Sequence, residues 1–141
     1  RWNVFETTLE SKGAKPVVET VEKDLEFFDG TYLPDGRVAV ISNIGYQGVP
    51  CVEGWDPVGN MMLYDPKNKN LRRLTFDQDA NWNPTIMNNG RIIYTRWEYT
   101  DLTHYYSRFV MHMNPDGTEN KALFGSGSMF PNSTFDVQPL P

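Results

Sequence analysis

Residues 28–38 read FDGTYLPDGRV, and residues 82–92 read WNPTIMNNGRI. The two stretches align without a gap at a spacing of 54 residues, as Gly36 and Gly90 show. Both keep an aromatic residue, a threonine, a Gly-Arg pair and the apolar residue that follows it. A third copy begins at residues 135–141, FDVQPLP, where the chain ends before the expected turn. Self-similarity at this period is typical of propellers and solenoids, so we expect a piece of a longer repeat protein.

A second motif alternates with the first. Residues 62–74 read MLYDPKNKNLRRL, and residues 111–123, 49 positions further on, read MHMNPDGTENKAL. Each copy has the pattern of a strand, a polar turn and a strand, because Pro115 fixes φ at the first corner and Gly117 supplies a positive φ afterwards. Asp35-Gly36 and Asn89-Gly90 are hairpin signals between the two preceding strands. Each repeat is therefore expected to form four antiparallel strands.

The predicted fold is all-β, with consecutive four-stranded antiparallel blades that are part of one β-propeller domain over residues 1–141. Antiparallel units of about 40–50 residues in series are typical of propellers. A helical solenoid is disfavoured, because no segment keeps the spacing i, i+3, i+4, i+7 over about 11 positions. The blades are expected at residues 1–20 (the end of one blade), 28–75 and 82–124 (two full blades) and 134–141 (the first strand of the next). The strands of the full blades are expected at residues 30–33, 37–43, 60–65 and 71–75, and at 84–87, 91–97, 108–114 and 119–124.

Composition limits the classes of partner. The net charge of −5 disfavours nucleic acid, because phosphate contacts need clustered Lys and Arg. The cluster of Lys67, Lys69, Arg72 and Arg73 is interpreted as a solvated strand edge. No apolar run approaches the ~20 residues of a membrane-spanning helix. Cys51 is the only cysteine, so no disulfide can form within the chain.

Candidate binding residues gather on the long loops. Successive strands run in opposite directions, so the loops after the second and fourth strands of a blade share one end, and the tight hairpin turns share the other. Long loops on a rigid scaffold are the usual binding elements, and here they span residues 43–59 and 96–107. The candidate ligand- or partner-binding residues are Tyr46, Trp55, Asp56, Trp97, Tyr99, Asp101, His104, Tyr105 and Tyr106.

Several of these residues also have plainer interpretations. Trp97 and Tyr99 fit packing between blades, and Asp101 with His104 fits a loop cap beside a surface histidine. The acidic and amide residues that alternate from Asp77 to Asn83 resemble a calcium loop, but they lack its glycine and distal glutamate, which favours hairpin chemistry. Without a zinc motif or a Cys-x-x-Cys-His motif in this chain, no metal site is predicted, and no catalytic residue is assigned.

Four segments carry a resemblance to a known family: residues 33–37 (LPDGR), 90–99 (GRIIYTRWEY), 113–118 (MNPDGT) and 130–133 (FPNS). Over roughly residues 28–141 the chain resembles the TolB-like propeller repeats, and more specifically the middle domain of the hydrazine synthase alpha subunit and its bacterial relatives. The Asp-Gly-Arg repeats are shared by many propellers, whereas YTRWEY and MNPDGT are more specific. The resemblance implies a six-bladed propeller in a larger exported protein, hence a periplasmic or extracellular location.

The sequence leads to three hypotheses about the function of the protein. The favoured hypothesis is a binding or docking module whose aromatic loop face engages a protein, a glycan or a neighbouring domain, with the rest of its own chain or other subunits as further partners. The alternative is the propeller part of a haem-containing redox enzyme similar to hydrazine synthase alpha, with c-type haem in neighbouring domains and no cofactor in this chain. The least favoured is a hydrolase or lyase site, for which only Glu53, Asp56, Glu98 and Asp101 are available.

Overall fold

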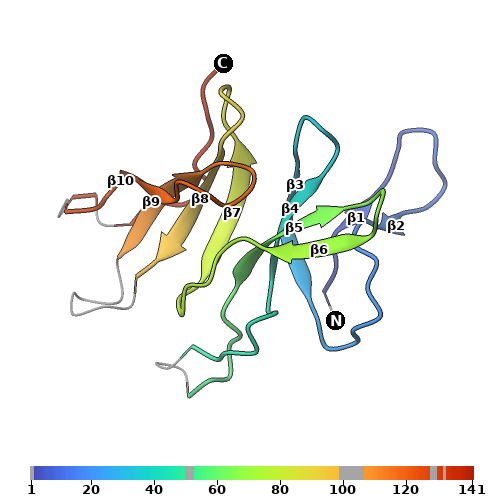
Figure 1. Cartoon of the computed structure of the whole chain (residues 1–141), viewed down its shortest axis with the longest axis horizontal. Coiled ribbons are helices and arrows are strands. Elements are labelled where there is room, and N and C mark those ends of the chain that lie inside the picture. The colour runs from blue at the N-terminus through green and yellow to red at the C-terminus, as the bar shows by residue number, and fades with distance from the viewer. Residues whose placement is uncertain (1, 50–52, 99–106, 128–129, 132) are drawn as a thin grey trace.

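The computed structural model describes residues 2–49, 53–98, 107–127, 130–131 and 133–141. Within these ranges all regular secondary structure is β, and no helix is present that could span a membrane (Figure 1). The strands are β1 (Phe5–Glu6), β2 (Lys15–Pro16), β3 (Phe27–Tyr32), β4 (Val38–Ser42), β5 (Asn60–Asp65), β6 (Asn70–Arg73), β7 (Asn81–Ile86), β8 (Ile92–Trp97), β9 (Arg108–Met113) and β10 (Lys121–Phe124). The prediction of an all-β chain is thereby confirmed.

The strands form two sheets of four and one short hairpin. The first sheet has the order β3-β4-β5-β6, the second has the order β7-β8-β9-β10, and β1 pairs with β2. Every strand pairs antiparallel with the strand that follows it in its sheet. The four-stranded antiparallel sheets expected from the two motifs are confirmed.

The first strand of each sheet begins three residues earlier than the turn residues suggest. Pairing in β3 shifts between Phe28 and Thr31, and pairing in β7 shifts at the corresponding place. Asp29 and Asn83 occupy these irregularities with φ of 49° and 50°, and Asp136 in the third copy has φ of 49°. Asp and Asn tolerate this left-handed region better than most residues. The irregularity lets each strand continue through a stretch that looks like a strand break.

Both faces of the first sheet are buried, which explains its nearly continuous apolar strands. Side chains alternate along a strand, so Val38 and Val40 of β4 face one side and Ala39 and Ile41 face the other. The first pair packs with Met62 and Tyr64 against Val18 and Leu25 of the N-terminal segment. The second pair packs with Met61 and Leu63 against Ile92, Tyr94, Met111 and Met113 of the second sheet.

Hydrogen bonds join each copy of the repeat to the next one. Strands β3 and β7 lie in contact, and the Asn83 backbone N–H donates to the Asp29 carboxylate at 3.1 Å, between corresponding positions of the two copies. Residues of the third copy make similar contacts with the second: Thr85 Oγ1 lies 3.4 Å from Gln138 Oε1, and Asn88 Nδ2 donates to the Leu140 carbonyl at 2.9 Å. Neighbouring copies of the sequence repeat are therefore also neighbours in space.

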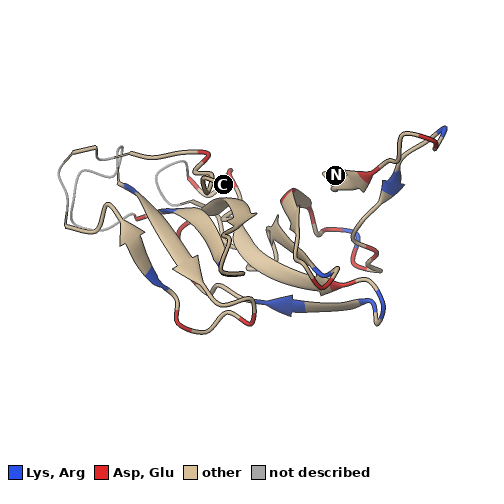
Figure 2. Ribbon diagram, turned by 90° about the horizontal axis from the view of Figure 1, so that it is seen from above, with Lys and Arg blue, Asp and Glu red and all other residues tan. Residues whose placement is uncertain are grey.

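Charged residues lie mostly on the connections and strand ends (Figure 2). The interiors of the sheets are largely uncharged in the same view. The charged residues of the described chain are therefore found mainly outside the centres of the sheets.

Candidate functional site

The long connections lie at one end of the two sheets, at the lower side of Figure 1. We call this the loop end and define it by the described residues 43–49, 53–59, 74–81 and Trp97-Glu98. Its first loop folds back on itself, because Gly48 bridges Pro57 and the Val49 N–H donates to the Asp56 carbonyl at 2.8 Å. The Asp-Gly and Asn-Gly turns lie at the other end, as the alternation of strand direction requires.

Arg96 forms the centre of a half-buried ion-pair cluster at the loop end. Its Nη1 lies 3.0 Å from Asp77 Oδ1, and its Nη2 lies 2.5 Å from Glu98 Oε1. The three side chains are only 24%, 16% and 17% exposed, respectively. Shielding from water strengthens such pairs and makes the loss of one partner costly. The cluster ties the connection between β6 and β7 to the end of β8.

A second set of hydrogen bonds joins this cluster to the first sheet. Arg73 Nη2 donates to Asn60 Oδ1 at 2.7 Å, and Arg73 Nε donates to the Thr75 carbonyl at 2.8 Å. Asn60 Nδ2 in turn donates to the Asp77 carbonyl at 3.0 Å. Thr75 Oγ1 accepts from the Met61 N–H at 2.8 Å and from Asn81 Nδ2 at 3.2 Å. The two sheets thus share one polar network at the loop end.

The surroundings of Glu98 disfavour the ionised form of its carboxyl. Burial raises the pKa of the Glu98 carboxyl, the nearby Asp79 and Asp77 raise it further, and Arg96 opposes the shift. Among the described residues, Asp77 Oδ2, Asn81 Oδ1 and Arg96 Nε are buried without a hydrogen-bond partner. In the part of the chain that the structure describes, no group of three or more His, Cys, Asp or Glu side chains could hold a metal ion. The arrangement therefore fixes the loop end from within, because its charged groups are directed at one another.

Trp97 is packed at the end of β8. Its ring stacks on Trp82 with the centroids 6.1 Å apart and an interplanar angle of 22°. The Arg108 guanidinium lies over both rings, at 5.2 Å from Trp97 and 5.9 Å from Trp82, and 5.4 Å from the ring of Phe135 in the third copy. These contacts match the packing interpretation of Trp97 and leave it a supporting role at the loop end.

The other predicted residues fall into two groups. Tyr46 is 65% exposed with φ of 49°, Trp55 is 83% exposed, and Asp56 is exposed, all on the first loop. Tyr99, Asp101, His104, Tyr105 and Tyr106 lie outside the described residues. Sequence reasoning missed Phe76, which is 74% exposed with Arg73 4.9 Å from its ring centroid.

Sequence reasoning also missed the buried network. Asn60 and Asn81 are fully buried at the starts of β5 and β7, yet only the second stood out, as part of an alternating Asp/Asn run. For Asn60 the available signal was a polar residue at the start of a strand whose next four residues are apolar or aromatic.

Comparison with known proteins supports the fold alone. No family model matches the chain, and no curated protein matches it. The structure is similar to that of a Mycobacterium tuberculosis puromycin-hydrolyzing peptidase, with a TM-score of 0.57 and 16% sequence identity. The likeness covers 86% of this chain and 17% of the peptidase chain, so the present chain spans about a sixth of that protein.

Proposed function

We propose that the chain is part of a β-propeller that works as a binding module, with the loop end as its ligand surface. Two features support the propeller. The first sheet has both faces buried by neighbours, and hydrogen bonds join the first copy to the second and the second copy to the third. Stacked units that cover one another in this way are the basis of repeat architectures. The resemblance to TolB-like repeats agrees with this proposal.

The observation that carries the binding proposal is the Arg96-centred network, which Phe76 adjoins through Arg73, together with the exposed aromatic side chains of the loop end. The network joins the connection after β6, the start of β5 and the end of β8, and so gives the loop end a fixed base. Trp55 and Phe76 expose 83% and 74% of their surface at this end. Large aromatic rings on a rigid base supply contact area at low entropic cost and dominate many interfaces.

The proposed ligand is a protein or glycan that meets the protein outside the cytoplasm. An aromatic ring offers a flat apolar face to a sugar or a peptide, and the exposed carboxylate of Asp56 accepts hydrogen bonds from hydroxyl or amide groups. The proposed periplasmic or extracellular location rests on the family resemblance.

The test replaces Trp55 by alanine in the full-length protein. Binding to a glycan array and to periplasmic or extracellular proteins identified by pull-down would be compared between wild type and the variant. Loss of a hot-spot aromatic should weaken the selected ligand about tenfold or more. Tyr32→Ala is the matched control, because Tyr32 is a half-exposed aromatic at the opposite end of β3.

Equal binding by wild type and Trp55→Ala would remove the first loop from the proposal. A Soret band in the purified full-length protein would instead favour the redox alternative.

A further inference from the structure

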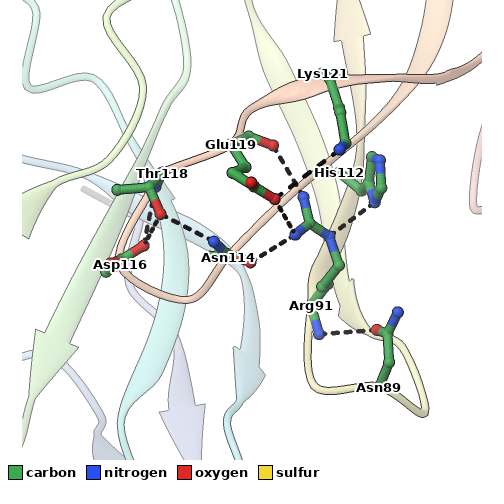
Figure 3. A network of polar contacts seen from close by, with 8 residues as sticks. All are labelled: Asn89, Arg91, His112, Asn114, Asp116, Thr118, Glu119 and Lys121. Atoms are coloured by element: carbon green, nitrogen blue, oxygen red, sulfur yellow. Dashed lines mark hydrogen bonds and ion pairs between the residues drawn. The ribbon is translucent and has the colours of Figure 1, made fainter.

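The Arg91 side chain lies between the turn at Asn89 and the turn that carries Asn114 to Glu119 (Figure 3). Its Nε donates to His112 Nδ1 at 2.9 Å, and its Nη1 donates to Asn114 Oδ1 at 2.5 Å. Nη2 donates to the Glu119 carbonyl at 2.9 Å, and Nη1 lies 3.3 Å from Glu119 Oε2. The Arg91 side chain is 14% exposed. One side chain thus joins the turn before β8, strand β9 and the turn before β10.

The bond between Arg91 and His112 fixes the protonation state of the imidazole. A guanidinium N–H can only donate, and it stays protonated at all ordinary pH values. His112 Nδ1 must therefore offer a lone pair, which places the proton of the neutral ring on Nε2. The imidazolium form carries protons on both nitrogens, so it cannot accept this bond. Its positive charge would also lie next to that of Arg91, which repels it.

The groups around His112 also oppose its protonation. Lys121 of β10 is its cross-strand partner on one side and Ile93 of β8 on the other. Burial lowers the pKa of His112, Arg91 and Lys121 lower it further, and Glu119 is the one neighbour that raises it. The C-terminal segment that runs along the start of β9, residues 133–141, has Asp136 as its one ionisable side chain.

The first sheet provides an internal comparison without a histidine. Leu63 of β5 stands where His112 stands in β9, and it is paired with Ala39 as His112 is paired with Ile93. Arg37, which corresponds to Arg91, turns to Asp35 of its own turn, with Nε 2.8 Å and Nη2 2.7 Å from Asp35 Oδ2. The same backbone therefore forms without a titratable group, and the fold does not require His112.

We propose that Arg91, His112, Asn114 and Glu119 form a proton-sensitive latch. With neutral His112 the latch is closed and holds the turn at residues 114–120 against the rest of the sheet. Proton binding to Nδ1 displaces the Arg91 bond and loosens this turn together with the edge strand β10. The device makes the outer edge of the second sheet responsive to the protonation of His112, whereas the matching edge of the first sheet has no such group.

The first test measures the ring tautomer and the mobility of the turn in the full-length protein. Histidine-selective ¹⁵N labelling should show His112 with its proton on Nε2 at about pH 7.5, well above an ordinary histidine pKa. Hydrogen exchange of residues 114–121, corrected for intrinsic rates, should rise about tenfold once the ¹⁵N spectra show His112 to be protonated, because one hydrogen bond from a charged donor is lost. Residues 65–71, the matching turn of the first sheet, should show no such rise.

Two variants separate the latch from a purely structural role. His112→Leu copies the first sheet at this position and should abolish the acid-induced rise at residues 114–121. Arg91→Gln removes a nearby cation and should move the titration midpoint of His112 upward. A ring protonated on Nδ1 at neutral pH, an undiminished rise in His112→Leu, or an unchanged midpoint in Arg91→Gln would each overturn the proposal.

Discussion

Replacing Arg96 by methionine tests whether the loop-end network stabilises the protein. Arg96 lies 3.0 Å from Asp77 and 2.5 Å from Glu98, and all three side chains are less than a quarter exposed. Methionine keeps much of the apolar stem and leaves two half-buried carboxylates without their cation. Breaking a buried pair by removing one partner costs about 3–5 kcal/mol, and partial exposure here places the expected loss near the lower limit.

An exposed pair in the same chain supplies the control. Lys15 Nζ lies 3.6 Å from Glu6 Oε2, with 76% and 38% of the side chains exposed. Surface pairs of this kind contribute less than about 1 kcal/mol, so Lys15→Met should change the free energy of unfolding only slightly. The difference in the free energy of unfolding between the two variants shows how much burial adds to the stability that an ion pair contributes.

The pH dependence of the Arg96→Met variant has a definite sign. The pKa of Glu98 already lies above its ordinary value, and Arg96 is the neighbour that lowers it. In the variant the folded-state pKa therefore rises further above the unfolded one. A raised pKa gives stability that is present at low pH and is lost as the pH rises through the folded-state value. The loss should thus be greater at about pH 7 than at about pH 5.

The assay is urea unfolding of the full-length wild type and both variants at these two pH values, followed by tryptophan fluorescence. Trp97, next to Arg96, is stacked on Trp82 and reports on the same end of the sheet. A loss in Arg96→Met no larger than in Lys15→Met would refute the reasoning, and so would a loss that is equal at both pH values.

Two further predictions concern packing between and within the sheets. Gly59→Ala would place a Cβ 2.7 Å from Ile41 Cγ2 and should lower the free energy of unfolding by about 1–3 kcal/mol through overpacking. Gly13→Ala is the control, because an added Cβ there meets nothing within 4 Å. Equal urea midpoints for the two variants would contradict this prediction. Tyr94→Phe removes the 2.8 Å hydrogen bond from the buried hydroxyl to Asn120 and should cost about 1 kcal/mol in the same assay, and an unchanged midpoint would show that the bond contributes nothing.

The sequence predicted the strands best where the pattern was local. The expected strand at residues 60–65 coincides with β5, because an unbroken apolar run lies between a glycine and an Asp-Pro turn. The starts of β3 and β7 were placed three residues late, because Asp29-Gly30 and Asn83-Pro84 look like strand breaks. Only the left-handed φ of the Asp and Asn, which depends on pairing with the next strand, carries each strand through this point.

The candidate site was less predictable, because its contacts join residues far apart in sequence. Alternating strand direction was enough to place the long loops at one end. The bond between Arg73 and Asn60, and that between Asn60 and Asp77, instead depend on how β5, β6 and β7 meet. A local pattern assigned Asp77 to hairpin chemistry, whereas the structure gives it an ion pair with Arg96.

The two repeats keep some positions alike and differ at others, and Leu63 and His112 show the physical basis of one difference. The left-handed positions Asp29, Asn83 and Asp136 set the path of the backbone, so only residues that tolerate this φ can occupy them. At the place held by Leu63 in one sheet and His112 in the other, the backbone pairing is the same and only the side chain faces the neighbour. Such positions can acquire a titratable or ligand-binding group at small cost to the fold. In this chain, new chemistry should therefore be sought at equivalent positions where the repeats disagree.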